Sequence, residues 1–532
     1  MMLRRLLLVA GTSCLHGIAA ASPTCKSASK HLTTTTTNGD ITGHIATDTS
    51  CVIEYLGIPY AQPPVGDLRF APPEDISSTA SEAYEAAEYG YDCPLSASGA
   101  VDYPGFTPQA QRIISYFASQ IDREQSEDCL TLNVWTKSAK GYKHREKPIL
   151  VFFYGGRFTI GNTATPFYNG KHFADHEDIV VVTVNYRINV FGFPGAPSLA
   201  AQNLGLRDQR KAVEWIRENA AGFGGDPDKI VISGQSSGGV AVDYWTYAYQ
   251  EDPIIHGLIA HSGNAFSFPV NADEVRVANW EEIVGTCNCT GAADAVACMR
   301  DVHWEDLKEA AAGVSSSSSS SVLRSVPAFY PTPDEEVVFE DYAALTEAGG
   351  YVKVPVLMGN NANEAGYYRI PAYSHGVVPT DEQVERFHLE SFICPVSYQA
   401  SHRRAEGVPA WAYRYAADWD NTRLYNASGA YHGVDLHMIF GGSVEVSGLP
   451  MSHEQFKLER LMQKAWYAFA DDPESGLSDV MGWPVFEEGE DTLVLLGDGN
   501  ESDVELVDPA VYASPCSTIT MGGIPASTET AA

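Results

Sequence analysis

The chain has 532 residues, of which 44% are hydrophobic and 19% charged, so it has ample apolar surface for a packed core. Its formal net charge of −34 repels phosphate backbones and anionic membrane surfaces, which argues against nucleic-acid binding as the main activity. Length alone leaves one large domain or two open. We therefore expect a globular protein of a class other than nucleic-acid binders.

The first 21 residues have the pattern of a secretory signal peptide. Arg4 and Arg5 precede an apolar run over residues 6–10, and residues 19–21 are alanines that offer a cleavage site. No later segment approaches the ~18 uninterrupted apolar residues of a membrane-spanning helix. We expect a secreted, extracellular protein that begins near residue 22 and ends in a flexible polar tail over residues 517–532.

The number of cysteines and the glycosylation sequons are typical of a secreted protein. Loss of Cys14 with the signal leaves nine of the ten cysteines, and in an oxidising environment most should be paired. One thiol should remain free, near Cys287 and Cys289. This C-x-C pair has no nearby histidine pair at zinc-ligand spacing, which favours disulfides over a metal site. Sequons that predict glycosylation begin at Asn288, Asn426 and Asn500.

Two early segments predict strands that are buried on both faces. Residues 148–154 and 179–186 are dense in Val, Ile and Phe and lack the alternation of a half-exposed strand. Residues 207–220 carry apolar side chains at helical spacing and lead to a third strand at 229–233. The alternation of strand and helix predicts an α/β fold with a parallel sheet and crossover helices.

A further buried strand is predicted at residues 352–358. It follows seven consecutive serines, residues 315–321, which we interpret as a flexible surface loop. The candidate catalytic residues fall on both sides of this run. We therefore expect one large domain over residues 22–516.

The strongest chemical signal is G-x-S-x-G at residues 234–238, between the predicted strand at 229–233 and a predicted helix at 240–249. In this arrangement, the nucleophile elbow, glycines allow a strained turn that exposes the central serine hydroxyl, while the helix behind it presents backbone N–H groups. Ser236 is therefore the candidate nucleophile. Ser237 lies outside the central position, and an ordinary glycine-rich turn is the alternative interpretation.

A serine hydroxyl needs a base to accept its proton, and the base needs an acid that orients it. In α/β folds with a nucleophile elbow, the acid and the base both follow the serine in the chain. Fifteen histidines are present, and spacing alone selects none of them. The developing oxyanion also needs backbone donors from an upstream glycine-rich loop. Residues 154–158, Y-G-G-R-F, are such a loop, although a plain turn explains them equally well.

Nearly the whole mature chain resembles the type-B carboxylesterase/lipase family, which includes cholinesterases and fungal lipases. Residues 223–227 (F-G-G-D-P) with 234–238 resemble the family's nucleophile signature, and residues 127–134 (E-D-C-L-T-L-N-V) resemble its second signature. Residues 55–66 and 184–187 are similar to further blocks of the family. The resemblance implies the α/β-hydrolase fold, with a large, mostly parallel central sheet flanked by helices.

The resemblance also assigns the remaining catalytic roles. Residues 359–366 are similar to the family's G-x-N-x-x-E-G motif, with an alanine inserted before the last glycine, which makes Glu364 the acid. Residues 432–441 resemble the family's histidine segment, which makes His432 the base; His437 takes a structural role instead. The oxyanion donors would be the amides of Gly156, Arg157 and Ser237. Arg157 departs from the family's triple glycine, so its side chain should point away from the acyl group.

Disulfide pairs follow from the same resemblance. It implies Cys93 with Cys129, Cys394 with Cys516, and the Cys287/Cys289 cluster with Cys298, for which we take Cys289; Cys25 with Cys51 is then the remaining pair. The loop between Cys93 and Cys129 contains an apolar segment, residues 111–117. It is compatible with a mobile lid, and hence with transient contact to a lipid interface, or with a static, core-packed helix.

These residues together predict a serine hydrolase that cleaves carboxylic esters through an acyl-enzyme, with no metal or organic cofactor. Gln235 replaces the glutamate typical of cholinesterases, and the loop between Cys93 and Cys129 has no Trp to stack on a choline. A carboxylesterase or a lipase is therefore expected, acting on a small-molecule or lipid ester. The alternative is a non-catalytic adhesion or binding protein of the same family. Oligomeric state, natural ester and acyl-chain preference are left open.

Overall fold

The fold was analysed in a computed structural model. It describes residues 32–76, 83–96, 99, 101–137, 146–315, 323 and 326–521. The proposed signal peptide, Cys25, most of the serine run and the end of the tail lie outside the described residues.

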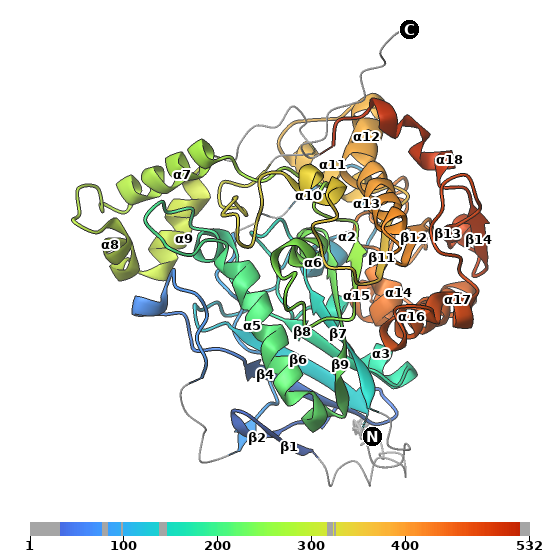
Figure 1. The fold of residues 1–532 in the computed structure, drawn as a ribbon, viewed down its shortest axis with the longest axis horizontal. Coiled ribbons are helices and arrows are strands. Elements are labelled where there is room, and N and C mark those ends of the chain that lie inside the picture. Colours follow the sequence, from blue (N-terminus) through green and yellow to red (C-terminus); the bar gives the residue numbers. More distant parts are fainter. Residues whose placement is uncertain are drawn as a thin grey trace, which may run out of the picture.

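A large sheet runs through the described residues and positions everything that follows (Figure 1). It has 11 strands in the order β14-β13-β12-β11-β10-β9-β7-β8-β6-β4-β3, and the strands from β13 to β8 in this order are parallel neighbours. The remaining strands pair antiparallel at the two edges. The strands are β3 (His44–Ile45), β4 (Val52–Pro59), β6 (Thr131–Lys137), β7 (Lys147–Phe153), β8 (Val180–Val184), β9 (Gly225–Gln235), β10 (Gly257–His261), β11 (Val356–Asn361), β12 (Ala410–Tyr415), β13 (Leu493–Leu496) and β14 (Val504–Val507).

A separate small sheet joins β1 (Thr33–Thr36), β2 (Gly39–Thr42) and β5 (Tyr84–Glu85). Helices cover both faces of the large sheet: α5, α6 and α13 pack on one face, and α3 and α16 on the other. The α-helices are α2 (Ala110–Phe117), α3 (Lys171–His176), α4 (Asn189–Gly192), α5 (Leu204–Asn219), α6 (Ser237–Ala248), α7 (Asp273–Thr286), α8 (Ala295–Asp301), α9 (Trp304–Gly313), α10 (Tyr342–Glu347), α11 (Ala365–Ser374), α12 (Asp381–His388), α13 (Cys394–Ala405), α14 (Leu436–Phe440), α15 (Ser443–Ser447), α16 (His453–Asp471), α17 (Gly476–Met481) and α18 (Ala510–Ala513). Short 3₁₀ or π segments are Gly66–Leu68, Pro166–Tyr168, Ala220–Phe223, Leu389–Ile393, Asp498–Asn500 and Ser514–Thr518.

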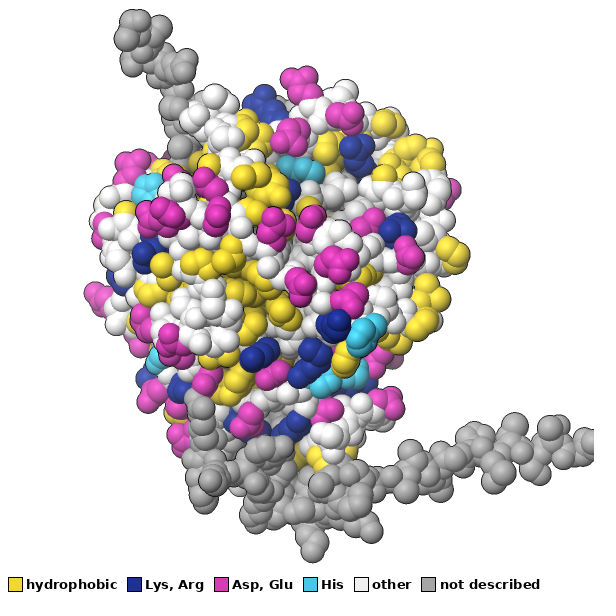
Figure 2. Space-filling model, turned by 90° about the vertical axis from the view of Figure 1, so that its right-hand side faces the viewer, with side chains coloured by type: hydrophobic (Ala, Val, Ile, Leu, Met, Phe, Trp, Pro, Cys, Tyr) yellow, Lys and Arg dark blue, Asp and Glu magenta, His cyan; other side chains and the backbone are white. Residues whose placement is uncertain are grey.

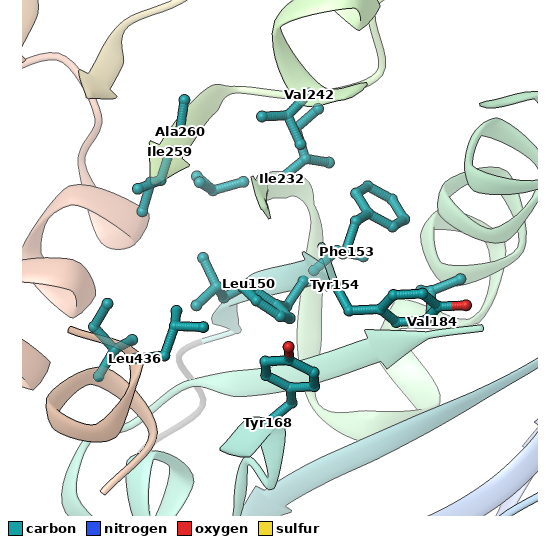
Figure 3. Close-up of a cluster of buried hydrophobic side chains, with 14 of the residues drawn as sticks. Leu150, Phe153, Tyr154, Tyr168, Val184, Ile232, Val242, Ile259, Ala260 and Leu436 are labelled. Atoms are coloured by element: carbon teal, nitrogen blue, oxygen red, sulfur yellow. The ribbon is translucent and has the colours of Figure 1, made fainter. Parts of the chain in front are cut away.

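The apolar runs of the sequence become the centre of the sheet. Side chains of β7, β8 and β10, and of β9 from Ile230 onward, are buried on both faces, as parallel strands covered by helices require. Figure 3 shows Leu150 of β7 and Ile232 of β9 in this core, with Val242 of α6 and Leu436 of α14 packed around them. The core therefore fixes the strand ends from which the candidate site is built.

The predicted elements have counterparts in the structure, with shifted ends. The helix predicted at 207–220 is α5, and the strands predicted at 148–154, 179–186 and 229–233 are β7, β8 and β9. The strand predicted at 352–358 was placed too early: β11 begins at Val356. Pro355 has no N–H to donate to a ladder, so pairing starts after it.

The surface is rich in acidic side chains, and three disulfides join described cysteines. Figure 2 shows acidic side chains scattered over one face among apolar and neutral ones.

Disulfides join Cys93 to Cys129, Cys289 to Cys298 and Cys394 to Cys516, and Cys287 is a free thiol. Cys51 is also disulfide-bonded; its expected partner, Cys25, lies outside the described residues. Within the described part of the chain, no helix is both long and apolar enough to cross a membrane.

Candidate active site

Ser236 lies in the sharp turn between β9 and α6, with φ 57° and ψ −121°. Its backbone N–H donates to the carbonyl of His261 at 2.8 Å, which ties the turn to the end of the neighbouring strand β10. Gly238 makes the turn possible, because a Cβ there would lie 2.1 Å from the carbonyl oxygen of Phe153. The geometry is that of a nucleophile elbow.

Glu364 and His432 also lie beyond the carboxyl ends of parallel strands, where α/β sheets bind their ligands. Glu364 follows β11 and precedes α11, and His432 lies in the loop between β12 and α14. The side chains meet: His432 Nδ1 is 2.5 Å from Glu364 Oε2, and both residues are at most 2% exposed. The carboxylate thus holds Nδ1–H, which leaves the lone pair of Nε2 available as a base.

Two donors fix the other oxygen of Glu364. Ser262 Oγ donates to Oε1 at 2.7 Å, and the backbone N–H of Asn361 donates to the same atom at 2.6 Å. The Asn361 side chain in turn donates to the carbonyl of Tyr431, next to the histidine. The acid and the base are therefore locked to each other and to the strand ends.

The Nε2 atom of His432 faces two further polar groups. Gln235 Nε2 is 3.0 Å from it and the Tyr368 hydroxyl is 3.3 Å from it. Tyr368 and Ser236 both border the same cavity beside His432. The structure thus brings Ser236, His432 and Glu364 together, with Tyr368 in contact with His432.

The glycine-rich loop at residues 154–158 packs against the elbow. A Cβ at Gly155 would lie 2.8 Å from the Cβ of Ser236, so only glycine permits this approach. Gly156 and Arg157 both have positive φ, 117° and 58°. The N–H of Phe158 donates to Ser237 Oγ at 3.2 Å, which anchors the loop to the first residue of α6. The expected oxyanion donors Gly156, Arg157 and Ser237 therefore lie side by side around Ser236.

Ser236 opens onto two cavities. The larger has a volume of about 270 Å³, and its apolar wall includes Ile114 and Phe117 of α2; the smaller is about 10 Å³. Arg157 borders both, beside Ser236. We expected its side chain to point away from the acyl group. Its charge partly opposes the effect of burial on Tyr367, which raises the pKa of that phenol to about 12.

The α2 helix is the segment that the sequence left open between a lid and a core-packed helix. Ile113 and Ile114 are buried, and Arg112 donates to the carbonyls of Glu445 and Val446 in α15. The Phe117 ring is perpendicular to the ring of His432, with centroids 6.4 Å apart. In this structure α2 is packed down as one wall of the cavity.

His437 is the second histidine of the segment 432–441, which resembles the family's histidine motif. It is fully buried against Phe167, with ring centroids 4.4 Å apart, and neither nitrogen has a hydrogen-bond partner among the described residues. Burial lowers its pKa to about 3, so it stays neutral. In the described part of the chain, no hydrogen bond or ring contact joins the His437 side chain to Ser236, His432 or Glu364.

Sequence reasoning missed Ser262 and Tyr368. Ser262 directly follows β10, the strand beside the strand that leads to Ser236, so the sheet order would have placed it at the site. Tyr368 comes four residues after Glu364, one helical turn into α11. A polar side chain four residues after the predicted acid, on the same face of a helix, is the signal that could have indicated Tyr368.

Comparison with known proteins decides the family. The sequence profile of the carboxylesterase family matches residues 29–387 and 378–509, which is most of the chain. The chain belongs to the carboxylesterase family. It is a carboxylic ester hydrolase with the α/β-hydrolase fold.

Individual relatives cover this esterase almost from end to end. A chlorogenic acid esterase of Aspergillus niger is 31% identical over 94% of this chain and 97% of its own length. Secreted lipase 5 of Gibberella zeae is 31% identical over 87% of this chain and 90% of its own. A para-nitrobenzyl esterase of Bacillus subtilis is 28% identical over 87% and 95%. The similarity thus extends over both halves of the site.

Proposed function

We propose that this esterase is secreted and hydrolyses its substrate through an acyl-enzyme on Ser236. The observation that carries the proposal is the buried contact of 2.5 Å between His432 and Glu364, beside a serine in an elbow turn. Secretion is supported by the N-terminal pattern, by the disulfides and by the similarity to a secreted lipase.

The reaction has two similar halves. His432 accepts the proton of Ser236 as the hydroxyl oxygen attacks the ester carbonyl, and then gives a proton to the departing alcohol. Water repeats the cycle on the acyl-enzyme. Glu364 stabilises the charged imidazole, and the backbone amides of Gly156, Arg157 and Ser237 hold each oxyanion.

The cavity supports an ester with a compact apolar portion. Its volume of about 270 Å³ lies near the lower end of small-molecule sites, and its wall is mostly apolar. The similarity to both a chlorogenic acid esterase and a lipase is compatible with an aromatic or a fatty acyl group. A long acyl chain would need α2 to move away from the cavity.

The test is to treat the secreted protein with an organophosphonate ester and to assay nitrophenyl esters of increasing chain length. We expect an adduct on Ser236, parallel loss of hydrolysis, and faster turnover of short or aromatic acyl groups than of long ones. Ser236→Ala should be inactive, whereas Ser237→Ala keeps the nucleophile and should lose only part of the activity, because it removes the hydroxyl that accepts from the N–H of Phe158. A folded protein with neither adduct nor turnover would favour the non-catalytic binding role.

A further inference from the structure

The two cavities at Ser236 differ in charge from the rest of the chain. The sequence has 68 acidic and 34 basic residues, counting Lys and Arg as basic. Among the described residues that border either cavity, however, none is Asp or Glu, and Arg157 alone is Lys or Arg. In a strongly acidic protein, the described lining of these cavities therefore holds one permanent positive charge and no carboxylate.

Arg157 belongs to the glycine-rich loop that packs against the elbow of Ser236, and it borders both cavities. Burial raises the pKa of Tyr367 to about 12 and that of Tyr368 well above its ordinary value, and the Arg157 charge opposes both shifts. Both tyrosines border the larger cavity. Because a Coulomb interaction weakens with distance, the positive charge lies near the phenols of that cavity.

A guanidinium in such a place favours one kind of substrate group. It is planar and always charged, and it matches a carboxylate with two parallel N–H···O bonds. A substrate carboxylate in either cavity would be attracted by Arg157, and no Asp or Glu of the described lining would repel it. We expect the Arg157 side chain to point away from the acyl group, so it would meet the alcohol portion of the ester.

We propose that the substrate is an ester whose alcohol portion carries a carboxylate, and that Arg157 is the specificity-determining residue that binds this group. Apolar side chains of the larger cavity, among them Ile114 and Phe117, hold the uncharged part of the ester. The carboxylate takes no part in bond breaking and departs with the alcohol when Ser236 is acylated. The substrate thus combines a compact apolar body with one negative charge.

A matched pair of substrates isolates that charge. The butyrate esters of 3-hydroxybenzoate and 3-hydroxybenzamide share the acyl group and the ring and differ in the charge of the departing alcohol. After correction for their rates of hydroxide-catalysed hydrolysis, we expect wild-type kcat/KM to be about tenfold higher for the carboxylate, because charge-assisted hydrogen bonds are stronger than neutral ones. The net charge of −34 acting alone would favour the amide.

Variants of Arg157 test whether this residue is the cause. Arg157→Met removes the charge and keeps an unbranched side chain, so the ratio of kcat/KM for the two esters should fall about tenfold. Arg157→Lys keeps the charge without the planar fork and should retain part of the preference. Weaker oxyanion binding or partial misfolding would slow both esters together, and the ratio would not change.

Arg112→Met is the matched control. Arg112 lies on α2, which forms one wall of the larger cavity, but its guanidinium donates to the carbonyls of Glu445 and Val446. Removing this charge should leave the ratio within about twofold of wild type. Three results would overturn the proposal: a wild type that does not prefer the carboxylate, which needs no variant; a preference that survives in Arg157→Met; and an equal fall in Arg112→Met.

This inference rests on the proposed function, and the two fail differently. If Ser236→Ala keeps its activity, or the organophosphonate labels another residue, the acyl-enzyme on Ser236 is wrong. If Ser236 is labelled and required while the ester pair shows no preference that depends on Arg157, the acyl-enzyme stands and only the substrate class is wrong.

Discussion

Gln235 puts an uncharged amide 3.0 Å from the base nitrogen of His432, and it is 1% exposed. Gln235→Glu would place a carboxylate there with nearly the same shape. Because a nearby negative charge favours the protonated imidazole, the base should lose activity at a higher pH. We expect the acid limb of the kcat/KM profile to move up by about one pH unit or more.

Gln120→Glu is the control for Gln235→Glu. Gln120 also borders the larger cavity, and its amide donates to the carbonyl of Gly99. A charge at this position should leave the acid limb nearly in place. Equal shifts in both variants would mean that the cavity's overall charge, and not contact with His432, sets the profile.

Ser262 supports Glu364, the proposed acid, from the end of the neighbouring strand. Ser262→Ala removes the donor to Glu364 Oε1 and leaves the backbone donor of Asn361. Because the carboxylate can then rotate away from the imidazole, we expect kcat to fall about tenfold with KM little changed. Ser233→Ala removes a similarly buried hydroxyl, which contacts His261 at 3.0 Å, and should affect stability without this loss in kcat.

At the scale of elements, much of the site was predictable. The buried strands before Gly155 and Ser236 follow from their apolar runs, because a parallel sheet covered on both faces needs them. Glu364 and His432 could be chosen only by resemblance to a family, since their pairing across 68 residues depends on tertiary packing. The place of Tyr368 at the site was not predicted, because a tyrosine near the start of a helix has many possible neighbours until the sheet order is known.

The α16 helix carries a buried acid outside the site. Glu459 is 2% exposed, its Oε2 has no hydrogen-bond partner among the described residues, and burial raises its pKa to about 7. The folded protein therefore binds a proton here that the unfolded chain releases near pH 4.5. Stability is unaffected below that pH and is lost as pH rises through 7.

Glu459→Gln should remove this pH dependence, because the amide stays neutral. We expect little difference from wild type at pH 4.5 and a gain of up to about 3 kcal/mol in the free energy of unfolding at pH 8. Glu454→Gln, on the same helix but bonded to Lys457, is the control. Denaturant unfolding at both pH values measures the effect; a gain that is equal at the two would contradict it.

At the scale of the whole molecule, the fold was predictable as a class but its edges were not. The apolar strand segments predict the parallel centre of the sheet. No sequence motif marks β13 and β14, which pair antiparallel at one edge of the sheet. Asn500 lies in the turn between these two strands. As a sequon it was grouped with Asn288 and Asn426, and spacing in the sequence gave no reason to separate them.

The structure does separate them. Asn288 and Asn426 are exposed, but the amide of Asn500 is engaged with Asp418: its oxygen accepts from the backbone N–H at 2.7 Å, and its nitrogen donates to the carbonyl at 2.9 Å. A glycan on that nitrogen would take away a donor hydrogen and crowd the Asp418 backbone. We therefore expect the folded esterase, expressed through a secretory pathway, to carry glycans at Asn288 and Asn426 and none at Asn500. Enzymatic deglycosylation in ¹⁸O water followed by peptide mass spectrometry reads each site separately, and an ¹⁸O-labelled aspartate at position 500 would show that the loop around Asp418 adopts another arrangement.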